Sequence, residues 1–258
     1  MFDQVKRFAK AILPRPVIAQ YRHRRQVDEV NMLAAICTPG DGVMIDVGGH
    51  TGGATAQFVD LNWRVVAYEP DPVNRAAFIK RFGQNPKVQI SENAVSQFED
   101  EQVTLYTSEI STGISGLSAF HESHRAAGVV STVRLDEDLK RRGIKKVDVL
   151  KVDVEGFDYF VLLGFDWSLR PRMGVYEFEE RKTRPLGYKL SDTVEFVTAK
   201  GYQVLYSVWE PIQRYGIEHT WRGLYRDPPE DHEDCWGNVL FFDLEIDRDK
   251  VERLFARR

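Results

Sequence analysis

The stretch "VMIDVGGHTGG" (residues 43–53) decides the fold of this chain. An apolar run of strand type contains one acid, Asp46, and four glycines follow within six positions. Glycine lets a backbone bend sharply and approach a ligand closely, and a helix that follows presents its N-terminal amides. The stretch therefore favours a nucleotide-binding turn between a strand and a helix over a merely flexible loop.

Short apolar runs alternate with helical patterns along most of the chain. The expected strands cover residues 43–47, 64–68, 88–91, 147–153, 173–179, 202–207 and 238–243. The expected helices between them cover residues 53–61, 72–82, 155–163 and 191–200. Strands rich in Val and Ile that are separated by helices predict βαβ units and a doubly wound, mostly parallel α/β sheet.

The length of 258 residues suits one α/β domain with an accessory element. We expect an N-terminal helical extension over residues 1–38 and the main domain over 39–258. Two insertions interrupt the alternation, at about 97–134 and 208–237. The first suggests extra strands and a loop, and the second is a long aromatic and charged loop. Long loops of this kind often cover binding sites.

The net charge of −4 argues against a nucleic-acid partner over the whole surface. Residues 1–25 nevertheless carry seven Lys and Arg against one acid, with apolar residues at helical spacing. This basic amphipathic helix either packs on the domain or contacts an anionic membrane surface. No apolar stretch is long enough for a transmembrane segment, and no signal peptide is visible. With two unpaired cysteines, we expect a cytoplasmic protein with an optional peripheral membrane contact.

The glycine stretch does not fit the dinucleotide fingerprint, because a third-position glycine is missing in either register. It does fit acid-x-Gly-x-x-x-Gly, as Asp46, Gly48 and Gly52. Glu69 ends the next strand, 21 residues after Gly48, where an acid can accept hydrogen bonds from ribose hydroxyls. Two such acids predict a pocket for an aminoacyl nucleoside, and S-adenosylmethionine is the obvious candidate. The alternative is that Asp46 caps the next helix and Glu69 is a solvated loop acid.

A second cluster follows in "VDVLKVDVEGFDYFVLLG" (147–164). Period-two alternation places Lys151 and Asp153 on one side of a strand, and Glu155 is expected to begin the next helix. The carboxyl end of a parallel sheet would then receive all three charged side chains together. Alternatively, the acids only satisfy amides at the helix N-terminus.

The runs "MIDVGGHTGGATAQF", "VVAYEPDPVN", "ENAVS", "VRLDEDL" and "VDVLKVDVEGFDYFVLLG" resemble the FkbM-like family of S-adenosylmethionine-dependent methyltransferases over roughly residues 40–180. The resemblance implies the Rossmann-like class I methyltransferase fold, with seven strands in the order 3-2-1-4-5-7-6 and an antiparallel last strand. It also implies O-methylation of a sugar, glycolipid or secondary metabolite. His50 departs from the family, which often has Asn there.

The resemblance assigns candidate roles to eleven residues. The cofactor-binding candidates are Asp46, Gly48, Gly49, His50, Gly52, Glu69, Asn93 and Ala94. The catalytic candidates are Lys151, Asp153 and Glu155. Either acid could serve as general base for a hydroxyl or bind a divalent ion such as Mg²⁺, with Glu177 as a third acid nearby.

Other functions stay open at this level. The acceptor is expected to be a small molecule or a glycan, but an RNA or protein methyltransferase is an alternative. A non-catalytic domain that binds a nucleoside or a partner through the aromatic segment is a second alternative, from a different class. An NAD(P)-dependent reductase is disfavoured by the failed fingerprint.

Overall fold

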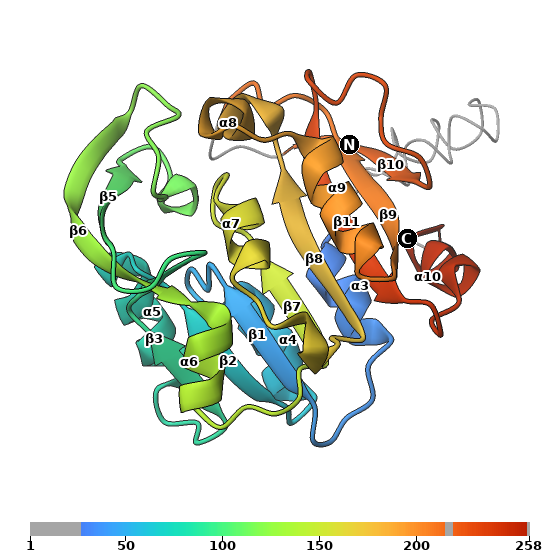
Figure 1. Ribbon diagram of the computed structural model, residues 1–258, viewed down its shortest axis with the longest axis horizontal. Coiled ribbons are helices and arrows are strands. Elements are labelled where there is room, and N and C mark those ends of the chain that lie inside the picture. Colours follow the sequence, from blue (N-terminus) through green and yellow to red (C-terminus); the bar gives the residue numbers. More distant parts are fainter. Residues whose placement is uncertain (1–26, 215–218, 257–258) are drawn as a thin grey trace, which may run out of the picture.

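A central eight-stranded sheet organises the computed structural model, which describes residues 27–214 and 219–256 (Figure 1). In spatial order its strands are β10 (Trp221–Tyr225), β9 (Tyr202–Trp209), β11 (Trp236–Asp243), β8 (Met173–Phe178), β7 (Val149–Val152), β1 (Val43–Val47), β2 (Arg64–Tyr68) and β3 (Val88–Ser91). Strands β3, β2, β1, β7 and β8 pair in parallel, whereas β11 is antiparallel to both β8 and β9. The predicted order with an antiparallel last strand is thus confirmed.

Strand β10 is an addition to the expected seven. It lies inside the segment 208–237, which was expected to be a loop, so that part of the prediction is wrong. The short run "WRGLY" lacks an alternating apolar pattern, and tertiary contacts stabilise it instead. Trp221 donates through Nε1 to Ser207 Oγ at 2.9 Å and stacks on Phe255. Strand pairing with β9 then extends the edge of the sheet.

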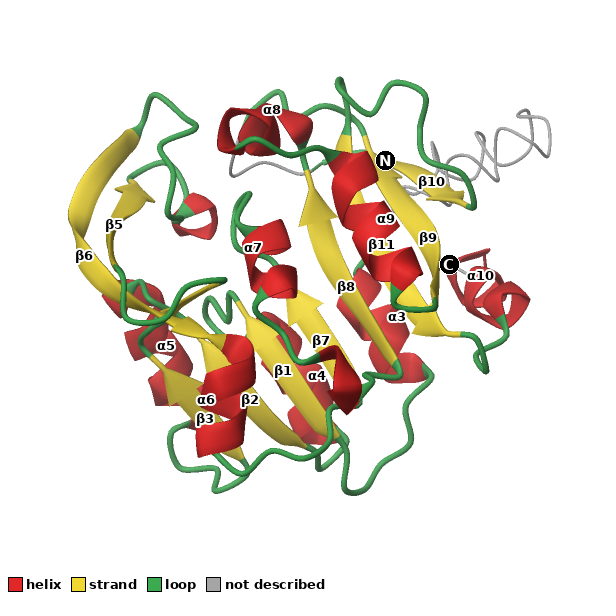
Figure 2. Ribbon diagram, in the orientation of Figure 1, coloured by secondary structure: helices red, strands yellow, loops and turns green. Residues whose placement is uncertain are grey.

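Helices cover both faces of the sheet (Figure 2). The α-helices are α3 (Glu29–Ala35), α4 (Gly53–Asp60), α5 (Pro72–Phe82), α6 (Leu135–Arg141), α7 (Asp158–Leu163), α8 (Glu180–Thr183), α9 (Leu190–Ala199) and α10 (Arg248–Ala256). Single 3-10 turns are η1 (Thr112–Ile114), η2 (Trp167–Leu169) and η3 (Arg184–Leu186). Helices α6, α7 and α9 pack on one face, and α3, α4 and α10 pack on the other.

The core follows the period of two along the strands. In β1, Ile45 and Val47 belong to the apolar cluster under α6, α7 and α9, whereas Met44 belongs to the cluster on the opposite face. A strand buried on both faces in this way needs a continuous apolar sequence, as "VMI" shows. Asp46 is the polar exception, and it shares the Met44 face with the start of α4.

The N-terminal region is described only from residue 27. Helix α3 lies within the helical extension expected over 1–38, and it packs against α4 and β8. Asp28 caps it by accepting a hydrogen bond from the Asn31 amide at 2.9 Å. The expected basic amphipathic helix lies outside the described residues. Among the described helices, none combines the length and the apolar character needed to cross a membrane.

A second, three-stranded sheet forms from the first insertion. Its strands lie in the order β4 (Ala94–Ser96), β6 (His124–Arg134) and β5 (Gln102–Ser108). In Figure 1, β5 and β6 form a curved arm above α5 and β3. The expectation of extra strands and a loop at 97–134 is confirmed. Between β5 and β6 the chain folds back on β5, where a bridge joins Tyr106 to Gly116.

The turn after β7 differs from the sequence expectation. Glu155 was expected to begin a helix, but α7 begins at Asp158. Glu155 and Gly156 take left-handed φ angles of 56° and 98°, which a helix excludes. The Asp158 carboxylate stabilises this turn by accepting bonds from the amides of Gly156 and Glu177, at 3.2 and 3.3 Å. The prediction of a helix start at Glu155 failed because one of these hydrogen bonds comes from β8, which is distant in the sequence.

Candidate functional site

A cavity of about 260 Å³ lies at the carboxyl ends of β1, β2 and β7. Ligands in open α/β sheets bind at this edge. Nine of the eleven predicted site residues line it: Gly48, Gly49, His50, Glu69, Asn93, Ala94, Lys151, Asp153 and Glu155. Asp46 and Gly52 are not among the lining residues, so the expectation of direct ligand contact from these two is not met in this arrangement.

The glycine turn is held tightly between two strands. The amides of Gly48 and Gly49 donate to the Tyr68 carbonyl at 3.0 and 2.9 Å. Gly48 has φ of 81°, and a Cβ there would lie 1.8 Å from the Asp153 carbonyl oxygen. Only glycine allows the β1 turn to approach the end of β7 this closely. Because of this close approach, Gly48 and Asp153 line the same cavity.

Asp46 acts beneath the cavity. It is fully buried, accepts a hydrogen bond from Thr55 Oγ1 at 2.7 Å, and lies 3.3 Å from Lys151 Nζ. Lys151 Nζ donates in turn to the Gly48 carbonyl at 2.6 Å. Asp46 therefore fixes Lys151 and the turn above it. Gly52 precedes α4, where a Cβ would collide with the Phe82 ring at 2.4 Å.

Glu69 is a buried acid, and the alternative of a solvated loop residue is wrong. Its side chain accepts hydrogen bonds from the amides of His50 at 2.7 Å and Asp71 at 2.8 Å, one on each carboxylate oxygen. Burial raises the pKa of Glu69 to about 7, although both amides favour its ionised form. The carboxylate is thus oriented by the backbone at the end of β2 and faces the cavity.

The first insertion, one of the two long insertions expected to cover a binding site, supplies a wall of the cavity. Residues that line the cavity from this loop are Thr112, Gly113, Ser115, Gly116 and Leu117. The loop is tied down by Ser115 Oγ, which donates to Asp71 Oδ2 at 2.8 Å, and by Asn74 Nδ2, which donates to the Thr112 carbonyl at 3.1 Å. His50 Nε2 lies 3.0 Å from Thr112 Oγ1. The dense run of Ser, Thr and Gly was the available sequence signal.

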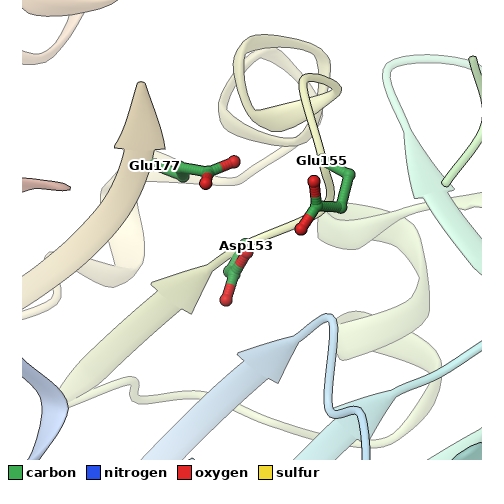
Figure 3. A group of neighbouring side chains, drawn as sticks. All are labelled: Asp153, Glu155 and Glu177. Carbon is green, nitrogen blue, oxygen red and sulfur yellow. The ribbon is translucent and has the colours of Figure 1, made fainter. Parts of the chain in front are cut away.

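On the β7 side, three acids converge. One carboxylate oxygen from each of Asp153, Glu155 and Glu177 lies within 4.8 Å of the other two. In Figure 3, Glu177 at the end of β8 and Glu155 in the turn after β7 point toward each other, and Asp153 lies at the end of β7. The Asp153 side chain keeps 47% exposure, whereas Glu155 and Glu177 are buried. The expectation that Glu177 joins this cluster is confirmed.

A buried lysine, which the sequence pattern did not indicate, lies among these acids. Lys182 of α8 donates through Nζ to Glu177 at 2.9 and 3.1 Å and lies 2.7 Å from Glu155 Oε2. Glu179 Oε2 lies 2.9 Å from the same nitrogen. Because the ammonium already bridges Glu155 and Glu177, this arrangement does not fit a divalent ion at the same position.

The electrostatics of this cluster suit proton transfer near neutral pH. Burial raises the pKa of Glu155 to about 7, and Lys182 opposes the rise. Burial and the Glu177 charge raise the pKa of Asp158 to about 8. Burial likewise raises the pKa of Glu177, against the attraction of Lys182. A carboxylate whose pKa lies close to the working pH is well matched to general-base catalysis.

Comparison with known proteins agrees with this architecture. A family model described as the methyltransferase FkbM domain matches residues 46–204. The chain is 25% identical to the AMB antimetabolite synthetase AmbE of Pseudomonas aeruginosa, over 69% of this chain and 10% of that protein. The chain thus spans about a tenth of that relative's length.

Two solved structures are similar at low identity. Precorrin-6Y C5,15-methyltransferase from Geobacter metallireducens has 14% identity and a TM-score of 0.45, with 83% of this chain and 86% of that chain covered. A TehB-like SAM-dependent methyltransferase from Corynebacterium glutamicum has 10% identity and a TM-score of 0.43, with 94% and 100% covered. Since the family model covers more than half of its residues, the chain belongs to the FkbM family of methyltransferases.

Proposed function

We propose that this chain transfers the methyl group of S-adenosylmethionine to a hydroxyl oxygen of a sugar, glycolipid or secondary metabolite. The observation that carries the proposal is one cavity with two different acidic ends. Glu69 lies at the β2 end, and Asp153 and Glu155 lie at the β7 end. The first end suits a nucleoside, and the second suits an acceptor that must lose a proton.

The β2 end fits the nucleoside part of the cofactor. A buried carboxylate can accept hydrogen bonds from both hydroxyls of a ribose, and Glu69 is oriented for this by two backbone amides. Asn93, after β3, and Ala94, the first residue of β4, also line the cavity and are candidates for contact with the adenine. The glycine turn leaves room for the ligand between these residues and Lys151.

The β7 end supplies the chemistry of the acceptor. When bound, S-adenosylmethionine supplies an electrophilic methyl group on a sulfonium. The protein then has to hold a hydroxyl in line with that group and accept its proton, because a protonated hydroxyl is a weak nucleophile. Asp153 and Glu155 are the carboxylates that line the cavity at this end. The loop at 112–117 would contact the acceptor from the opposite wall.

A ligand panel followed by an acceptor screen tests the proposal. Thermal unfolding is measured with S-adenosylmethionine, S-adenosylhomocysteine, NADH and NADPH; a ligand at about 100 times its Kd stabilises by about 2.7 kcal/mol. We expect stabilisation by the two S-adenosyl compounds alone. Purified protein is then incubated with labelled cofactor and sugar, polyketide, peptide or RNA acceptors. An O-methyl ether is the expected product; a nicotinamide-only shift, or a product methylated solely on RNA or protein, would refute the proposal.

A further inference from the structure

Lys182 is almost completely buried among the acids, with 1% of its side-chain surface accessible. Its Nζ lies 2.7 to 2.9 Å from carboxylates of Glu155, Glu177 and Glu179. Burying an ammonium is costly unless carboxylates and hydrogen bonds compensate for the lost hydration. Three buried carboxylates around one cation exceed what charge balance requires. The arrangement therefore indicates a role beyond stability for this lysine.

The backbone is shaped to bring Glu155 against Lys182. Glu155 has a φ of 56°, a left-handed conformation that costs energy for a residue with a Cβ. The neighbouring Gly156 is packed on Lys182, where a Cβ would lie 3.0 Å from the lysine Cβ. On the other side, a Cβ at Gly116 would lie 3.1 Å from Glu155 Cβ. The loop of the first insertion and α8 thus hold Glu155 from both sides.

We propose that Lys182 is a positioning residue that takes the place of a divalent ion among these acids and holds Glu155 as the general base of methyl transfer. This inference rests on the proposed function. It distinguishes Glu155 from Asp153, whose side chain is half-exposed and lies 3.6 Å from Lys151 Nζ. A buried carboxylate that is fixed by an internal cation keeps one orientation toward the acceptor, whereas a solvated carboxylate samples several.

The step balances without any metal. The acceptor oxygen forms a bond to the methyl carbon as the carbon–sulfur bond breaks, and that electron pair stays on sulfur. The hydroxyl proton moves to the carboxylate of Glu155, whose Oε2 lies 2.7 Å from Lys182 Nζ. Ionised Glu155 thereby becomes neutral as the sulfonium loses its positive charge. Lys182 keeps its proton throughout and acts only through Glu155.

The charged groups around this pair come from several elements. They are Asp153 and Asp158 near the end of β7, Glu177 and Glu179 at the end of β8, Arg181 on α8, His124 on β6 and His219 before β10. Most of those closest to Glu155 are acids and raise its pKa, whereas Lys182 lowers it. Removing the lysine charge should therefore shift the ionisation of Glu155 to higher pH.

Substitution of Lys182, read as a pH profile, tests the positioning role. Lys182→Met removes the charge, Lys182→Arg keeps it, and Lys189→Met is a matched control at an exposed lysine seven residues further along. For Lys182→Met we expect a fall in kcat of about 10²-fold or more. The acid limb of its kcat profile should move up by about one pH unit or more. Affinity for S-adenosylhomocysteine should stay unchanged, and Lys182→Arg should restore part of the rate and the position of the limb.

Two results would overturn the proposal. One is a Lys182→Met enzyme that is slower but keeps the wild-type acid limb, because a purely structural role predicts that outcome. The other is a result with Mn²⁺, for which the wild-type protein is compared with Glu177→Gln. The Mn²⁺ titration is followed by electron paramagnetic resonance. We expect the wild-type protein and Glu177→Gln to bind the same amount of Mn²⁺, because the wild type has no Mn²⁺ site that depends on Glu177. A bound Mn²⁺ that is present in the wild type and lost in Glu177→Gln would show that a metal displaces Lys182. If S-adenosylhomocysteine does not bind, the proposed function fails. The Mn²⁺ titration still decides whether Lys182 or a metal ion is the cation among the acids.

Discussion

Glu69 should make the protein less stable as the pH rises, and Glu69→Gln should remove this dependence. Burial raises the pKa of Glu69 from its ordinary value of 4.5 to about 7. Between these values the folded protein binds more protons at this site than the unfolded chain. The stabilisation is therefore fully present below pH 4.5 and is lost as the pH rises through about 7.

The magnitude follows from the two pKa values. Integrating the difference in bound protons gives a loss of about 2.5 kcal/mol in the free energy of unfolding between pH 5 and pH 8. Glu69→Gln cannot ionise, so this contribution disappears. Glutamine also offers only one acceptor oxygen to the amides of His50 and Asp71. That loss is independent of pH and cancels when only the slopes are compared.

Urea unfolding at a series of pH values, followed by circular dichroism, measures the effect. The wild-type curve minus the Glu69→Gln curve should change by about 2.5 kcal/mol over this range. Glu92→Gln is the control, since this acid lies at the end of the neighbouring strand with 76% of its side chain exposed. Parallel curves for wild type and Glu69→Gln would refute the reasoning, because Glu69 would then be ionised in the folded state at neutral pH.

The same residue links cofactor binding to protons. Ribose hydroxyls that donate to Glu69 stabilise its ionised form, so binding of S-adenosylhomocysteine near pH 6.5 should release up to about one proton. Calorimetry in buffers with different ionisation enthalpies detects this release, and Glu69→Gln should lack it. The variant should also bind more weakly by about 1.5–3 kcal/mol, the cost of losing hydrogen bonds to a charged group.

Two further predictions concern the glycine turn. Gly48→Ala should prevent folding or lower the melting temperature, because its Cβ would overlap the Asp153 carbonyl, whereas Gly53→Ala has open space and should leave thermal stability nearly unchanged. Equal melting temperatures for the two variants would contradict this. His50→Asn should keep the melting temperature, because Asn tolerates the φ of 46° at this position, while removing the contact with Thr112. If instead the cofactor affinity of His50→Asn falls as far as that of Glu69→Gln, the His50 ring contacts the ligand directly.

The sequence by itself determined the sheet and one edge of the cavity. Acid-x-Gly-x-x-x-Gly at residues 46–52 and Glu69 belong to consecutive strand–turn–helix units, so their chemistry can be read from local spacing. Lys151, Asp153 and Glu155 were predictable for the same reason, since β7 lies beside β1 in a doubly wound sheet. Local spacing could not show that Asp46 would lie beneath the cavity, because that depends on its contacts with Thr55 and Lys151.

The arrangement of the groups around Glu155 at the acceptor end depends on tertiary contacts. Lys182 is 27 residues from Glu155, and nothing in its short helix marks it as buried; the meeting of β7 and β8 places it among the acids. The left-handed turn at Glu155 likewise depends on the Asp158 contact with β8. The loop at 112–117 reaches the cavity only because Asp71 and Asn74 tie it down. Contacts between residues distant in the sequence determine where Lys182, the turn at Glu155 and the loop at 112–117 lie. A local sequence pattern does not predict such contacts.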